Sequence, residues 1–203
     1  MPKVYSIDGI VPVVHPSAFV HESAVLVGDV IVGARAYVGP AACLRGDFGR
    51  IVVEEGANIQ DTCMLHGFPG KDTVVGAEST IGHGAVLHGC VVRRGALIGM
   101  NCVVNDNAEV GEDAVVAALA FVKAEAKIEP RTLVAGIPAR TLRALSEQEL
   151  RWKKDNMHLY QQLALRSAKT MKEVEALTQV EPNRKRIDIP GAVPLSELKK
   201  AHA

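Results

Sequence analysis

Three of the seven histidines, His66, His83 and His88, stand near the middle of the chain at spacings that could bring them together. A neutral imidazole can accept a proton as a general base, and it is also a common zinc ligand. Three imidazoles with an open fourth position are the donor set of a catalytic zinc site. We interpret the remaining histidines as surface residues: His15, His21, His158 and His202. Convergence of the three depends on the elements that carry them.

A six-residue repeat runs through most of the chain. An apolar residue recurs every six positions from Val14 to Val134, with three slips of phase, and a small residue often follows four positions later. This pattern predicts short strands, three of which close one triangular coil of about 18 residues. An ordinary amphipathic sheet does not require so regular a repeat. Residues 14–140 are therefore predicted to form a parallel β-helix.

The register of the repeat sorts the polar residues by side of the coil, which we name A, B and C in chain order. His66 and His88 follow the leading apolar residue of side A steps, so they stack on neighbouring coils about 4.8 Å apart. Arg45 lies one coil below them on the same side. His83 belongs to side C, with Asp61 beneath it. A threefold ring would press side A of one chain against side C of the next, which predicts a homotrimer with its site between subunits.

The segments outside the repeat have their own signals. Residues 1–13 are predicted to lead into the β-helix. Ser146-x-x-Glu149 is a capping box, and apolar residues then recur every seven positions, which predicts a helix within residues 144–172. Prolines interrupt residues 173–203, for which we predict a flexible tail.

Composition excludes several classes of protein. Lys plus Arg and Asp plus Glu are both 23, so the net charge is zero and a nucleic-acid partner is not expected. The absence of a long apolar run argues against a membrane partner. The cysteines lack C-x-x-C spacing, so we expect a reduced cytoplasmic location. From their positions in the repeat, all four cysteines are predicted to be small core residues: Cys43, Cys63, Cys90 and Cys102.

Several motifs carry a resemblance to a known family. Arg45-Gly46-Asp47, Asn58-Ile59-Gln60-Asp61, His66 and His83-x4-His88 resemble the signature of the γ-class carbonic anhydrases. Longer stretches, such as LRGDFGRIVVEEGANIQD and IGHGAVLHGCVVRRGALIGMN, are similar to the phenylacetic acid degradation proteins and slightly less to the carnitine operon proteins. The resemblance implies an all-β, left-handed parallel β-helix with a C-terminal α-helix, assembled as a trimer.

The resemblance also implies roles for residues at and around a metal. His66, His83 and His88 match the zinc ligands, with His83 contributed by the adjacent subunit. Gln60 matches a residue that orients a bound water or bicarbonate. Tyr160 is a candidate for a helical tyrosine near the metal. Iron and cobalt are the alternatives to zinc.

Four further residues match positions that support the metal ligands or the subunit contact in the same family. Arg45 and Asp61 correspond to an ion pair between subunits, and Asp47 and Asn58 to polar positions behind the ligands. The acidic loop of the prototype anhydrase has no counterpart, because Phe68-Pro69-Gly70-Lys71 stands in its place.

These features predict a zinc-dependent trimeric enzyme that hydrolyses acyl-CoA thioesters in phenylacetic acid catabolism. Zinc lowers the pKa of a bound water from about 15.7 to about 7, which supplies hydroxide at neutral pH. One alternative is a carbonic anhydrase proper acting on CO2 and bicarbonate. Another is a hexapeptide acyltransferase that uses CoA at the subunit interface with a histidine base, because residues 136–140 resemble the terminal repeat of that class.

Overall fold

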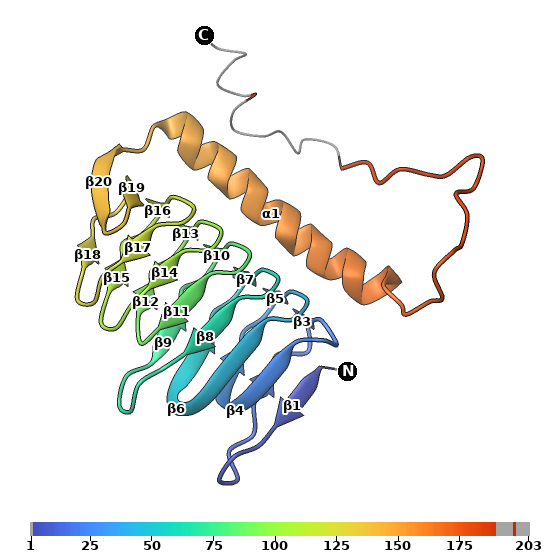
Figure 1. Cartoon of the computed structure of the whole chain (residues 1–203), viewed down its shortest axis with the longest axis horizontal. Helices are drawn as coiled ribbons and strands as arrows, with labels where there is room; N and C mark the ends of the chain where they lie inside the picture. Colours follow the sequence, from blue (N-terminus) through green and yellow to red (C-terminus); the bar gives the residue numbers. More distant parts are fainter. Residues whose placement is uncertain (1, 190–196, 198–203) are drawn as a thin grey trace.

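The chain folds as a parallel β-helix followed by one α-helix (Figure 1). The computed structural model describes residues 2–189 and residue 197. Neighbouring coils pair in parallel register, such as Leu44 with Leu65 and Leu65 with Leu87. The predicted fold class is confirmed, whereas the left hand of the coil stays an implication of the resemblance.

Sides A and B form one twelve-stranded sheet, because two long strands bend around the corner between them. These are β4 (Val25–Val32) and β6 (Cys43–Val53). The other strands of side A are β1 (Lys3–Tyr5), β8 (Met64–His66), β11 (Val86–His88), β14 (Val103–Val104) and β17 (Phe121–Val122). Those of side B are β2 (Val13–Val14), β9 (Thr73–Val75), β12 (Val91–Val92), β15 (Glu109–Val110) and β18 (Lys127–Ile128).

Side C is an eight-stranded sheet. Its strands are β3 (Phe19–Val20), β5 (Tyr37–Val38), β7 (Asn58–Ile59), β10 (Thr80–Ile81), β13 (Leu97–Ile98), β16 (Val115–Val116), β19 (Thr132–Gly136) and β20 (Ala139–Ala144). Only β20 pairs antiparallel among the described strands, so it turns back along β19 and ends the stack.

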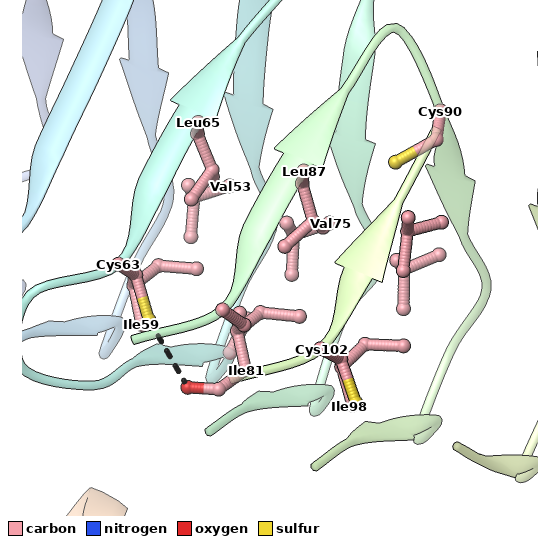
Figure 2. Packing of buried hydrophobic residues seen from close by; sticks show 14 of the residues in the cluster. Val53, Ile59, Cys63, Leu65, Val75, Ile81, Leu87, Cys90, Ile98 and Cys102 are labelled. Atoms are coloured by element: carbon pink, nitrogen blue, oxygen red, sulfur yellow. Dashed lines mark hydrogen bonds between the residues drawn. The ribbon is translucent and has the colours of Figure 1, made fainter. Parts of the chain in front are cut away.

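The interior of the coils explains the six-residue repeat. Most steps contribute one buried Leu, Ile or Val, such as Leu65, Val75 and Ile81, and Figure 2 shows these side chains in columns across successive coils. Small residues occupy the corners because little space remains there. Complete burial of one such aliphatic side chain stabilises the fold by about 1.5–3 kcal/mol.

Coil corners need a backbone conformation that few residues adopt easily. Gly56, Asn101 and Asp113 have positive φ at corner turns, where glycine is unstrained and Asn or Asp is tolerated better than other residues. The N–H of Gly56 donates to the carbonyl of Ala34, 2.8 Å away on the preceding coil. The corners are thus stacked by hydrogen bonds as the strands are.

Helix α1 (Glu147–Thr170) follows β20 and runs along side C (Figure 1). Ser146 caps it and forms the predicted capping box with Glu149. The helix packs on β3, β5 and β7, burying Met157 and Ala164. Buried Lys153 donates to the carbonyl of Gly95 and to the carboxylate of Asp113, because a buried ammonium needs partners.

The ends of the chain differ in structure. Within residues 1–13, β1 pairs with β4 at the first coil. Residues 172–189 form no helix or strand. Residues 190–196 and 198–203 of the predicted tail, including His202, lie outside the described residues. Among the described residues, no helix is long and apolar enough to cross a membrane.

Candidate functional site

Two of the predicted histidines meet at the corner between sides A and B. His66 ends β8 and His88 ends β11, and the two residues pair directly in the sheet. His66 and His88 are 22 residues apart, which is four residues more than one coil of about 18. The extra residues form an inserted turn between Phe68 and Lys71. His66 Nδ1 lies 3.1 Å from His88 Nε2, and the ring centroids are 5.1 Å apart. The predicted stacking of these histidines is confirmed.

A carboxylate stands behind each imidazole of the pair. The other ring nitrogen of His66 lies 3.0 Å from Asp47 Oδ1, and that of His88 lies 2.5 Å from Asp106 Oδ1. An ionised carboxylate only accepts hydrogen bonds, so it holds the N–H of a neutral imidazole on its own side. The two nitrogens that face each other then both carry lone pairs. Such an arrangement is favourable with a cation, either a proton or a metal ion, between them.

The facing nitrogens fit a metal ion in spacing and in type. Two nitrogens bound to one tetrahedral zinc at about 2.0–2.1 Å lie about 3.3–3.4 Å apart, close to the observed 3.1 Å. A carboxylate behind each ligand is the usual support of a metal-binding histidine. His66 and His88 are therefore able to serve as two ligands of one ion.

Local electrostatics keep His66 neutral and Asp47 ionised. Burial lowers the pKa of His66, against the opposing effect of its hydrogen bond to Asp47. Burial alone would raise the pKa of Asp47, but hydrogen bonds from Arg45 and His66 outweigh it and hold that pKa below its usual value. Arg45 Nη1 lies 2.5 Å from Asp47 Oδ2.

The corner that carries the pair is braced from below. Thr73 is fully buried, and its hydroxyl donates to the carbonyl of His66 at 2.5 Å. The same oxygen accepts the N–H of Gly89, the residue after His88, at 2.9 Å. One side chain thus ties the backbones of both histidine segments together and limits their relative movement.

His83 stands at a different corner, between sides C and A. Its Nδ1 lies 2.8 Å from Asp61 Oδ2, as the register predicted. Gln60 is buried and supports it: its side-chain oxygen accepts the His83 backbone N–H at 3.2 Å, and its side-chain amide donates to Asn58 Oδ1. Asn58 donates in turn to Thr80. Within one chain, Gln60 and Asn58 therefore position His83, and the role of Gln60 toward a bound water stays a prediction.

Tyr160 lies on the same side as Asp61. Its ring packs against Tyr37, with centroids 5.7 Å apart, and joins α1 to β5. Burial, followed by the charge of Asp61, raises the pKa of Tyr160 to about 12. Its hydroxyl therefore stays protonated at neutral pH, and it can donate a hydrogen bond but is a poor base.

The single chain leaves part of the predicted constellation unassembled. Among the described residues, no group of three His, Cys, Asp or Glu gathers as a metal site. Arg45 pairs with Asp47, and Asp61 pairs with His83. The expected contact between Arg45 and Asp61, like the approach of His83 to the other histidines, requires a second subunit and stays a prediction.

Two residues of this region, Asp106 and Tyr37, were not predicted from the sequence. Asp106 lies 18 residues after His88, one coil further along the same corner, so the register could have placed it beside the imidazole. Tyr37 lies 21 residues before Asn58 and pairs with it on side C. Only the folded structure shows that Tyr37 meets Tyr160.

The cysteines lie as predicted with one exception. Cys63, Cys90 and Cys102 are buried (Figure 2), and burial raises the pKa of Cys63 to about 11 and that of Cys90 to about 12. Neither of these two thiols is a ready nucleophile. Cys43 was wrongly assigned to the core: it alternates with buried Leu44 along β6 and is only half-buried.

Comparison with known proteins places the chain among the hexapeptide-repeat proteins. A transferase of that class from Anaplasma phagocytophilum has a solved structure with a TM-score of 0.77 and 34% identity, over 80% of this chain and 96% of that one. An acetyltransferase from Vibrio cholerae O1, complexed with acetyl coenzyme A, has a TM-score of 0.50 and 25% identity, over 57% and 71%. No family model matches the chain.

A curated relative defines the group more closely. The carnitine operon protein CaiE of Salmonella newport (strain SL254) is 56% identical over 183 residues, which cover 90% of this chain and 92% of the relative. The chain belongs to the family of the carnitine operon protein CaiE. Of the resemblances named from sequence, that to the carnitine operon proteins is confirmed, while those to the γ-class carbonic anhydrases and the phenylacetic acid degradation proteins gain no support.

The predicted reaction class is corrected by the same findings. A zinc-dependent hydrolase of acyl-CoA thioesters was expected, but the related structures are hexapeptide transferases and acetyltransferases. The transferase alternative agrees with them better. The physical reason for the error is that a histidine-lined corner of this fold suits several chemistries, so the motif alone does not select one.

Proposed function

We propose that this protein is an acyltransferase that uses a coenzyme A thioester and works at a site shared by two subunits. The observation that carries the proposal is the set of carboxylate-backed imidazoles of His66, His83 and His88 at two corners of the coil. The acetyl coenzyme A complex of a related acetyltransferase supports the choice of donor.

Acyl transfer requires from the protein a general base and a site that binds the thioester. An acceptor hydroxyl or amine attacks the carbonyl carbon, a new C–O or C–N bond forms, and the C–S bond to coenzyme A breaks. The proton leaves the acceptor for an imidazole and then passes to the departing sulfur.

His83 is the imidazole best arranged as that base. Its Nδ1 is held by Asp61, which leaves Nε2 as the nitrogen that can take a proton. Its side chain is 45% exposed, so an acceptor can approach it. Gln60 and Asn58 hold its backbone in place from beneath.

The outer surface of side A supports assembly with a second copy of the chain. An unbroken column of outward-facing apolar residues crosses six coils: Val25, Cys43, Met64, Val86, Val103 and Phe121. On side B the corresponding column ends in Glu109 and Lys127, which form an ion pair. A closed trimer packed through side A would carry His83 of one subunit toward the histidine pair of the next.

We also propose zinc as a cofactor of the histidine pair, with iron or cobalt as the alternatives. His66 Nδ1 and His88 Nε2 have the spacing and the supporting carboxylates for it. When bound, such an ion supplies a Lewis acid that polarises an oxygen of the thioester or the acceptor. His83 of the neighbouring subunit is either the base or, as the resemblance implied, the third ligand.

Metal content of purified variants separates these two roles. If His83 is the base, zinc is lost from His66→Ala and His88→Ala but retained in His83→Ala. Loss of zinc from all three variants makes His83 a ligand. Retention of zinc by His66→Ala and His88→Ala contradicts the cofactor proposal.

The reaction is tested by adding acceptors to the trimeric protein with acyl-CoA thioesters and measuring acylated product together with free CoA thiol. The name of the CaiE relatives makes carnitine the first acceptor to try, and the sequence resemblance adds phenylacetyl-CoA to the donors. Transfer requires that product and thiol appear together and only with acceptor present. If the rate of CoA thiol release is the same with and without every acceptor tested, the acyltransferase proposal is wrong.

A further inference from the structure

Two exposed phenylalanine rings flank the histidine pair. The Phe48 ring lies 5.5 Å from the His66 ring, and the Phe68 ring lies 6.5 Å from the His88 ring. Phe48 is 62% exposed and Phe68 is 55% exposed, although the whole chain has only four phenylalanines. Contiguous exposed apolar surface marks a site of ligand or protein binding more than singly scattered apolar residues do.

Both rings are presented by well-defined backbone. Phe48 stands where β6 bends around the corner, and Phe68 begins the inserted turn on the next coil. That turn is closed by the N–H of Lys71, which donates to the carbonyl of Phe68 at 2.8 Å. Pro69 and Gly70 occupy its centre, with φ of +73° at Gly70, as a type II turn requires.

The strand and the turn are packed too closely for either to shift freely. A Cβ placed on Gly49, the residue after Phe48, would lie 2.2 Å from the carbonyl oxygen of Lys71 and 2.7 Å from that of Phe68. The absence of a side chain at Gly49 therefore lets the turn rest on β6. This contact fixes the backbone positions of Phe48 and Phe68 relative to each other.

We infer that Phe48 and Phe68, here called the aromatic pair, bind the apolar part of an acyl group larger than acetyl. The inference rests on the proposed acyltransferase function and adds the substrate class. An acetyl group offers one methyl and cannot cover two rings on opposite members of the histidine pair. A longer hydrocarbon chain extending from the thioester carbonyl can cover both, and it removes their apolar surface from water.

The expected preference follows from the area buried. Each methylene moved from water to an apolar surface strengthens binding by roughly fourfold when it is completely buried. Hexanoyl-CoA has four methylenes more than acetyl-CoA, so even partial contact predicts a preference of at least about tenfold.

Calorimetric titration of the full-length trimer with acetyl-CoA and hexanoyl-CoA tests the inference without relying on turnover. The variant is the double substitution Phe48→Ala and Phe68→Ala. The matched control is Leu165→Ala, because Leu165 is also an exposed large apolar residue, 65% exposed, but lies on α1 and away from side A. We expect wild type and Leu165→Ala to prefer hexanoyl-CoA by about tenfold or more, and the double variant to bind both thioesters within about threefold.

Three results would overturn the inference. The first is equal affinity of wild type for the two thioesters. The second is an unchanged preference in the double variant. The third is conversion of the double variant to monomers in sedimentation, which would assign the rings to a subunit contact. A wild type that prefers hexanoyl-CoA but transfers no acyl group would refute the proposed function and leave the binding inference standing.

Discussion

At the scale of single residues, a carboxylate contacts each of the three imidazoles of the candidate site. Asp47, Asp61 and Asp106 each hold one nitrogen of a histidine and leave the other for a ligand or a proton. They thereby select a tautomer that the histidine alone would not maintain. Substitution of any one should affect reactivity more than stability, since all three are at least partly exposed.

Asp106→Asn tests this directly. The amide keeps the shape of the side chain but removes the negative charge 2.5 Å from His88 Nδ1. Loss of such a supporting group costs about 10–100-fold in activity or metal affinity, and we expect that fall in the initial rate of acyl transfer. Asp155→Asn, an exposed substitution on α1, should keep the wild-type rate. A fully active Asp106→Asn protein would mean that His88 needs no such partner.

At the scale of elements, the contact between Tyr160 and Tyr37 is part of the joint between α1 and the β-helix. Burial raises the pKa of Tyr160 to about 12 in the folded chain, whereas an unfolded tyrosine ionises near 10. Between those values the unfolded state has released a proton that the folded state retains. Stability from this group is therefore complete below pH 10 and is lost as the pH rises toward about 12.

Denaturant unfolding at pH 8 to 11 checks this sign. The free energy of unfolding of wild type should fall as the pH rises past 10, and Tyr160→Phe should show a smaller fall because phenylalanine does not ionise. Tyr5→Phe, at an exposed tyrosine of β1, should follow wild type. Parallel pH dependence in Tyr160→Phe and wild type would assign the alkaline loss to other groups.

At the scale of the whole molecule, the apolar column of side A should hold the subunits together. Val86→Asp places a charge in that column at a residue 36% exposed in the single chain. Val91→Asp makes the same change at an outward position of side B. Sedimentation equilibrium should give a monomer mass for Val86→Asp and a trimer mass for Val91→Asp. A trimer of Val86→Asp would move the interface elsewhere.

A shared site also predicts complementation between inactive chains. His83→Ala and His88→Ala lack different parts of the site, so each should be inactive alone. In co-expressed random trimers, about a quarter of the interfaces join an intact His88 to an intact His83 of the neighbour. Activity should recover to about that fraction of wild type. No recovery in mixed trimers of confirmed composition would show that each chain carries a complete site.

The register of the strands was open to prediction because the repeat has a constant length. Counting coils places His88 over His66 and His83 over Asp61, and both contacts are present. The same count reaches Asp106 but gives no reason to choose it among the other polar residues of that corner. The outward direction of Cys43 was missed, because a small residue at a corner step resembles a core residue.

The β-helix and the two histidine columns were predictable from sequence alone, since both follow from a six-residue period that the buried Leu, Ile and Val of the interior impose. Tertiary structure decided which ring nitrogens face each other, that Thr73 joins the two histidine segments, and that Gly49 seats the turn carrying Phe68. Those outcomes depend on side-chain orientation and on close packing between residues of different coils. A six-residue period states which side of the coil a residue belongs to, but not what its side chain touches there.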